Sequence, residues 1–148
     1  MAVAFPFLAA ADPVSETGLP LPRFASLKSD EVNMRAGPGQ KYPVKWTYRR
    51  EDYPVKIINE YQQWRQVEDA EGVTGWMHKT VLSGRRTGLI AQDETLLLKK
   101  PIDNADTIAK LMKGVIVDIE NCRPDWCEIE IGKKDGWVPA SLLWGSRP

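Results

Sequence analysis

The chain has 148 residues, and its 20 Lys and Arg residues balance its 20 Asp and Glu residues, so its formal net charge at pH 7 is zero. A neutral chain has no long-range field that would attract a nucleic acid or an anionic membrane surface, and we expect neither as a partner. Its two cysteines and single histidine also fall short of the four ligands of a structural zinc site. We therefore expect no metal and no cofactor.

An apolar leader opens the chain. Residues 1–11 carry no charge, and Ala9-Ala10-Ala11 resembles the small-residue cleavage site of a secretory signal. The basic start of such a signal is missing, because the first cationic residue is Arg23, so either the true start lies upstream or Met1 was added. We interpret residues 1–11 as the remnant of an export signal, too short to span a bilayer, with a disordered apolar tail as the alternative. We expect a periplasmic or secreted protein with no integral membrane segment.

The proline-rich residues 12–23 are expected to form an extended linker. After them the chain repeats one pattern at an offset of about 62 residues, which shifts by one at two points. The repeated positions include Pro38 and Pro101, Trp64 and Trp126, Gly75 and Gly136, and Trp76 and Trp137. This ordered recurrence indicates two copies of one small domain, which we place at residues 24–84 and 85–148. The recurring tryptophans are expected to be structural.

Within each copy the apolar residues alternate with a period of two, which is typical of half-buried antiparallel strands. Each copy is expected to hold an opening strand broken at Asp-Glu, a long loop, a hairpin and a short strand carrying Gly-Trp. The expected bounds are 26–35 and 88–99 for the opening strand, 36–52 and 100–114 for the loop, and 59–63 and 121–125 for the hairpin turn. No segment predicts a helix longer than one 3₁₀ turn. Such short strands predict a small, strongly bent barrel.

Four segments resemble motifs of one known family. Residues 33–39, Asn-Met-Arg-Ala-Gly-Pro-Gly, resemble the motif that opens bacterial SH3-like domains, and residues 121–127 resemble the hairpin of the exported members. Gly75-Trp76-Met77 and Gly136-Trp137-Val138 resemble the ending of that domain. The second copy departs from the opening motif, with Leu98-Lys99-Lys100-Pro101 in its place, so no ligand role of the opening arginine is carried over. The resemblance implies an all-β chain of two small, partly open SH3-like β-barrels in tandem.

The two cysteines lie in the second hairpin. If Pro124 and Asp125 form the centre of the turn, Cys122 faces Cys127 across a non-hydrogen-bonded pair, with Cβ atoms about 4.5–5.5 Å apart. Slight tightening brings them to the distance of about 3.5–4.5 Å that a disulfide requires. We predict a structural disulfide, with a metal site or a redox pair as the alternatives. A redox motif, however, is usually C-x-x-C near a helix.

No catalytic constellation is evident. His78 follows Gly75-Trp76-Met77, and we expect it at the surface or in a turn, because both cysteines, the candidate nucleophiles for a cysteine–histidine pair, lie in the other copy. Asp30-Glu31 and Asp93-Glu94 fall at expected turns, which suggests turn chemistry more than acid–base catalysis. We expect no catalytic, cofactor-binding or metal-binding residue, and no enzymatic activity.

Aromatic side chains are the best candidates for a ligand site. Tyr42, Trp46 and Tyr48 in the first long loop, and Tyr61 in the first hairpin turn, have no aromatic counterpart in the second copy. Aromatic side chains in a loop beside a barrel suit a groove for peptide or sugar. The alternative is that Trp46 fills a core or packs the two copies together, a part that Trp144 can also play.

With the family resemblance, these residues predict a non-catalytic exported module that binds a cell-wall component, peptidoglycan peptide or glycan, or a partner protein of the envelope. One alternative is a targeting or regulatory subunit of a separately encoded wall hydrolase. The other is a secreted protein acting on another organism's surface.

Overall fold

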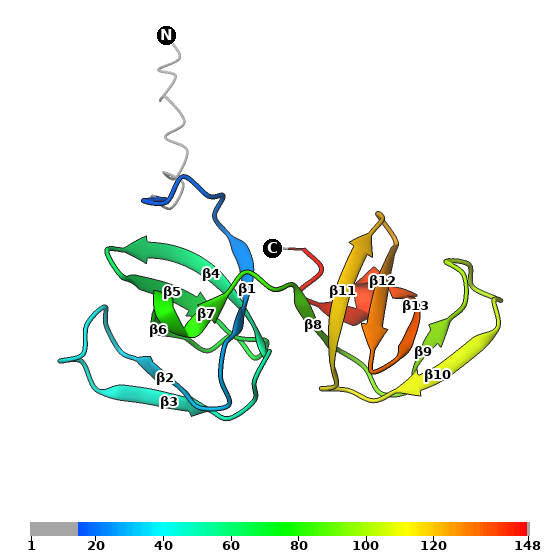
Figure 1. Cartoon of the computed structure of the whole chain (residues 1–148), viewed down its shortest axis with the longest axis horizontal. Coiled ribbons are helices and arrows are strands. Elements are labelled where there is room, and N and C mark those ends of the chain that lie inside the picture. Colours follow the sequence, from blue (N-terminus) through cyan, green and yellow to red (C-terminus); the bar gives the residue numbers. More distant parts are fainter. Residues whose placement is uncertain (1–14, 148) are drawn as a thin grey trace, which may run out of the picture.

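The computed structural model describes residues 15–147 as two antiparallel sheets of seven strands each, side by side along the chain (Figure 1). The first sheet has the order β3-β2-β6-β5-β4-β1-β7 and the second the order β10-β9-β13-β12-β11-β8-β14, so both copies have one topology. Neither sheet closes on itself. The helices of the described part are two 3₁₀ turns, η1 (Lys79–Val81) and η2 (Ala140–Leu142). The predicted all-β, partly open architecture is confirmed.

The strands of the first sheet are β1 (Arg23–Leu27), β2 (Val32–Arg35), β3 (Val44–Tyr48), β4 (Pro54–Tyr61), β5 (Trp64–Glu68), β6 (Thr74–His78) and β7 (Leu82–Ser83). Those of the second are β8 (Thr87–Ile90), β9 (Thr95–Leu98), β10 (Thr107–Leu111), β11 (Ile116–Cys122), β12 (Trp126–Ile131), β13 (Lys134–Pro139) and β14 (Leu143–Trp144). Over residues 15–147, no helix is long and apolar enough to cross a membrane.

The predicted leader, residues 1–11, lies outside the described residues, and so do residues 12–14 of the predicted linker. The described part of the linker does not run free of the first barrel. The Ser15 hydroxyl donates a hydrogen bond to Glu60 Oε1 at 2.8 Å, and the Thr17 hydroxyl donates to the same oxygen at 3.1 Å. Residues 15–17 are therefore tied to the tip of the β4–β5 hairpin.

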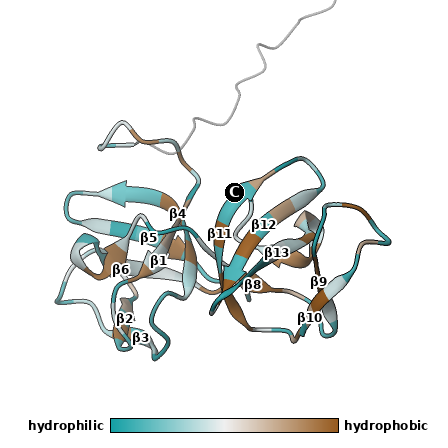
Figure 2. Ribbon diagram, turned by 45° about the vertical axis from the view of Figure 1, so that its right-hand side comes forward, coloured by the Kyte–Doolittle hydropathy of each residue, from teal (hydrophilic) through white to brown (hydrophobic). Residues whose placement is uncertain are grey.

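Two sequence predictions about the loops and turns were wrong. Each predicted long loop contains a strand, β3 in residues 36–52 and β10 in residues 100–114, and each pairs with the strand before it. The predicted turn at 59–63 is also too wide. β4 continues to Tyr61, which pairs with Trp64, so only Gln62 and Gln63 form the turn. The hairpin is hydrophilic toward its tip (Figure 2). The turn was predicted too wide because a polar strand end resembles a turn in sequence.

Each barrel has its own apolar core. The glycine of the recurring Gly-Trp pair lies where two strands around that core approach each other closely. At Gly75 a Cβ atom would lie 2.3 Å from the Met34 side chain, and at Gly136 it would lie 2.8 Å from the Leu98 carbonyl oxygen. Glycine therefore allows β6 to approach β2, and β13 to approach β9. The adjacent tryptophans are partly covered or buried: Trp76 pairs with Arg35, and Trp137 is 9% exposed.

The two barrels contact each other around the connection from β7 to β8 and through an aromatic pair. Arg85 binds Asp52 of the first barrel at 3.3 Å and Asp118 of the second at 2.8 Å. The Thr87 hydroxyl donates a hydrogen bond to the Asp52 carbonyl oxygen at 2.6 Å. Phe24 of the first barrel meets Trp144 of the second edge to face, with ring centroids 5.1 Å apart. Trp144 thus takes the interdomain part that its sequence position suggested.

Candidate functional site: an aromatic groove on the first barrel

Trp46 lies on β3, the edge strand of the first sheet, and 59% of it is exposed. Its ring meets that of Tyr48 edge to face at 6.4 Å, and the Tyr48 ring lies 5.6 Å from that of Tyr53. A tryptophan this exposed neither fills a core nor packs the two barrels together. The alternative reading of Trp46 as a buried packing residue is therefore wrong.

Trp46, Tyr48 and Tyr53 line a groove of about 440 Å³, which we call the aromatic groove. Its other walls include Arg50 and Glu71. None of the ion pairs within residues 15–147 involves either of these two side chains. The groove thus combines aromatic surface with one free charge of each sign.

Tyr48 is part of the scaffold of this groove. The residue is buried, and its hydroxyl donates a hydrogen bond to Asp69 Oδ2 at 2.8 Å. Burial, reinforced by the carboxylate of Asp69, raises the pKa of Tyr48 far above its usual range. The other Asp69 oxygen accepts the backbone N–H groups of Glu71 and Val73, each at 2.9 Å. Tyr48 therefore lines the groove, while its hydroxyl group and Asp69 hold the β5–β6 turn.

The remaining two candidate residues lie elsewhere. Tyr42 covers Gly37, where a Cβ atom would come within 2.5 Å of its ring, and it does not line the groove. Tyr61 is 49% exposed at the end of β4 and does not line the groove either. The structure thus brings together Trp46 and Tyr48 of the four candidates and adds Tyr53. The sequence does not mark Tyr53 as a site residue, because Tyr53 begins the alternating run of Tyr53, Val55 and Ile57, a pattern typical of a half-buried strand.

The residues considered for catalysis have structural roles. Cys122 pairs with Cys127 in the β11–β12 hairpin, and a disulfide joins them with an S–S distance of 2.13 Å. His78 caps η1, its Nδ1 accepting the Thr80 backbone N–H at 3.3 Å, and its ring meets Trp64 edge to face. The histidine and the disulfide belong to different barrels, so they do not form a nucleophile–base pair.

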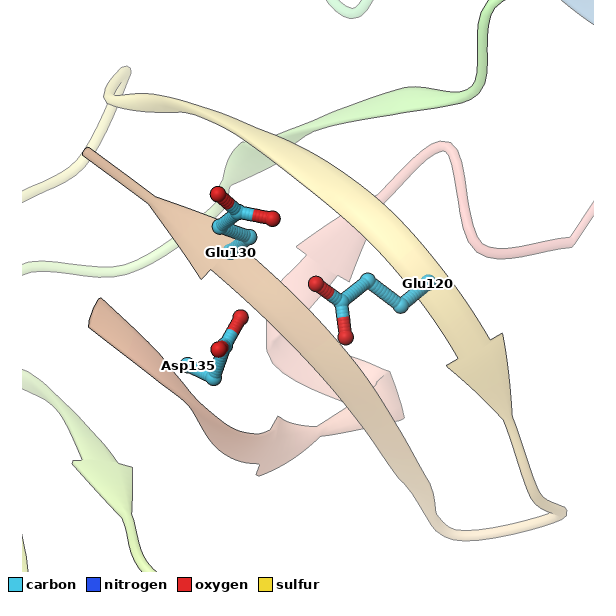
Figure 3. A group of neighbouring side chains, drawn as sticks. All are labelled: Glu120, Glu130 and Asp135. Atoms are coloured by element: carbon cyan, nitrogen blue, oxygen red, sulfur yellow. The ribbon is translucent and has the colours of Figure 1, made fainter. Parts of the chain in front are cut away.

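One acidic cluster was not anticipated. Glu120, Glu130 and Asp135 come from three neighbouring strands, β11, β12 and β13, and their carboxylates converge within 4.8 Å of one another (Figure 3). The pKa of Glu120 is raised to about 7, first by the hydrogen bond that its protonated form shares with Asp135 and then by Glu130. We assign no metal to this cluster, because its carboxylates are largely exposed to water and no second observation points to a bound ion.

We expect Glu120→Gln to stabilise the protein at pH 8 and to have little effect at pH 5. The folded pKa of Glu120 lies above its ordinary value of 4.5. Between these values the folded state therefore keeps a proton that the unfolded state has lost. The free energy of unfolding then falls as the pH rises from 4.5 to about 7. Urea unfolding of both proteins at the two pH values measures the difference. Equal gains at both would show that the carboxylates do not repel one another.

The model of the bacterial SH3 domain family matches residues 28–84 and 91–145. A Bacillus subtilis (strain 168) protein named as an N-acetylmuramoyl-L-alanine amidase, YrvJ, is 25% identical over 131 residues, which cover 80% of this chain and 25% of that protein. The structure of NlpC2 from Trichomonas vaginalis is 16% identical, with a TM-score of 0.39, over 82% of this chain and 47% of that one. An NlpC/P60 family protein from Bacillus cereus ATCC 10987 is 9% identical, with a TM-score of 0.37, over 81% of this chain and 55% of that one.

This chain thus spans a quarter of the length of the amidase relative and about half the length of these two solved chains. The family match, by contrast, covers most of the chain in two separate segments, each within one of the two sheets. The chain belongs to the bacterial SH3 domain family and carries that domain twice.

Proposed function

We propose that this chain is a non-catalytic, exported module that binds a component of the bacterial cell wall, and that the aromatic groove is its binding site. The observation that carries the proposal is the exposed ring of Trp46 beside this groove. Leaving so large an apolar surface in water has no structural benefit, whereas aromatic side chains at binding sites concentrate the binding energy. Membership of the bacterial SH3 family and the name of the amidase relative support a wall component as the ligand.

The chemistry of the groove suits a wall peptide. Aromatic faces accept the apolar parts of a peptide or a sugar ring, while Arg50 and Glu71 offer a partner to a carboxylate and to an amine. The structural roles of the cysteines and the histidine support a non-catalytic function, because both cysteines lie in the disulfide and His78 caps η1.

A second candidate role is the targeting or regulation of a separately encoded wall hydrolase. It is favoured by the match to a quarter of a protein named as an amidase. In that role the aromatic groove binds the wall in the same way, and a partner enzyme supplies the chemistry. Pull-down from an envelope extract distinguishes the two roles by whether a hydrolase is retained.

Trp46→Ala is expected to weaken sedimentation with purified peptidoglycan at least about tenfold, as the loss of a binding hot spot does. The melting temperature should change little, because Trp46 is 59% exposed. The matched control is Tyr61→Ala, which removes an aromatic side chain of similar exposure outside the groove and should bind like the unaltered protein. Equal weakening by the two variants would contradict the site, and no sedimentation of the unaltered protein would contradict the function.

A further inference from the structure

The aromatic groove does not end on the first barrel. A second depression of about 370 Å³ lies between the barrels, and Arg50, Tyr53 and Glu71 line both. On the far side, the second depression is lined by Lys113 and Trp144 of the second barrel. Because they share three wall residues, the two depressions adjoin. We call them together the interbarrel groove, which runs from Trp46 across Tyr53 to Trp144.

Contacts between the barrels hold the two halves of this groove at a fixed spacing. Arg85 binds one carboxylate from each barrel, Asp52 and Asp118. The Thr87 hydroxyl of the second barrel also donates a hydrogen bond to the Asp52 carbonyl oxygen of the first at 2.6 Å. A ligand that binds the first half therefore finds the second half already in place, without an entropic cost for ordering the two barrels.

The interbarrel groove carries free charges of both signs. Arg50 and Glu71 stand where the two depressions meet, and Lys113 lies on the second barrel. Among the ion pairs of residues 15–147, none involves these three side chains. The Lys113 backbone N–H donates to the Asp93 carboxylate at 2.9 Å, which fixes its turn while its ammonium group stays free. Two cations and one anion complement a chain that carries carboxylates and an amine, which a peptide does and a neutral glycan does not.

We propose that a single extended peptide segment of the wall occupies both halves of the interbarrel groove, so that the two barrels recognise one ligand together. This inference rests on the proposed function and adds the form of the ligand and the part of the second barrel. The first barrel supplies Trp46, Tyr48 and Tyr53 to the interbarrel groove and the second supplies Trp144. This difference is expected if the two barrels bind different parts of one ligand. Lys113 is the residue of the second barrel that pairs with a carboxylate of the ligand.

The test compares three probes from digested peptidoglycan: a disaccharide-peptide monomer, its peptide-cross-linked dimer and the peptide-free glycan. Calorimetry on the full chain is expected to show the dimer binding at least about tenfold more tightly than the monomer, because the dimer spans both halves. Lys113→Glu should remove most of this advantage and leave the affinity for the monomer unchanged. The matched control, Lys133→Glu, makes the same charge change at an exposed turn outside the groove and should keep the advantage.

Two results would overturn the proposal. If Lys113→Glu and Lys133→Glu bind the dimer equally well, the second barrel takes no part. If the glycan binds as tightly as the dimer, the ligand is not a peptide. The variant Trp46→Ala shows whether only the shared-groove proposal fails or the proposed function fails as well. If Trp46→Ala weakens both peptide probes while Lys113→Glu weakens neither, the site is confined to the first barrel. If Trp46→Ala weakens neither, the aromatic groove itself is not the site.

Discussion

Glu60→Ala is expected to lower the free energy of unfolding of the first barrel by about 3–5 kcal/mol, the usual cost of removing one partner from a buried ion pair. The Glu60 side chain is fully buried, and one of its oxygens lies 3.2 Å from Arg23 and 3.3 Å from Arg65. Without the carboxylate, two largely buried guanidinium groups remain without their counterion. The hydroxyl groups of Ser15 and Thr17 lose their acceptor in the same step.

Urea unfolding followed by tryptophan fluorescence measures this loss. The matched control is Glu68→Ala, whose carboxylate lies 4.0 Å from Lys56 in a partly exposed pair and should contribute about 1 kcal/mol or less. Equal losses for the two variants would show that burial of the Glu60 pair contributes nothing.

Acid should have the same effect as the mutation. Burial raises the pKa of Glu60, but hydrogen bonds from Ser15, Thr17 and Arg23 outweigh it and hold the pKa at about 2. The unfolded state takes up the proton near the ordinary value of 4.5. The contribution of Glu60 is therefore complete above that pH and is lost as the pH falls toward 2. Glu60→Ala should lack this part of the acid dependence, whereas Glu68→Ala should retain it.

Reduction of the disulfide is expected to lower the free energy of unfolding of the second barrel by about 2 kcal/mol, as calculated for closing so short a loop. The double variant Cys122→Ser/Cys127→Ser should show the same loss and no response to a reductant. By mass, the native protein should be about 2 Da lighter than its reduced form, since a disulfide lacks two hydrogens. Two freely alkylating thiols in protein from its native compartment would contradict the bridge and the export proposal together.

The ion pair and the disulfide occupy the same place in the two copies. Glu60 faces Arg65 in the first hairpin, and Cys122 faces Cys127 in the second. Each pair stands beside a turn followed by the recurring tryptophan, Trp64 or Trp126. The two copies thus close the same hairpin by different chemistry, one sensitive to acid and the other to reductants.

The fold was largely predictable because it depends on local patterns. The period of two and the ordered recurrence of glycine and tryptophan predict paired antiparallel sheets, and a turn centred on Pro124 and Asp125 predicts that Cys122 faces Cys127. Strand β3 was missed because Val44 and Trp46, two of its three alternating large side chains, face solvent and only Tyr48 is buried, so the alternation marks a core weakly.

The candidate site was only half predictable, because it depends on tertiary placement. Trp46 and Tyr48 were recognised as unmatched aromatics, but nothing in the sequence separates them from Tyr42 and Tyr61. The cluster of Glu120, Glu130 and Asp135 was missed for a similar reason. It forms only when three strands become neighbours.

The position of β3 and β10 at the ends of their sheets has a consequence for association. An edge strand exposes unpaired backbone groups that invite another chain to extend the sheet. Here β3 carries Lys45 and β10 carries Lys110. The pairing of both strands is also interrupted by a register shift, between Met34 and Arg35 and between Thr107 and Ala109. Lysine charge and irregular pairing at these edges disfavour the addition of another strand, so we expect the tandem not to polymerise through them.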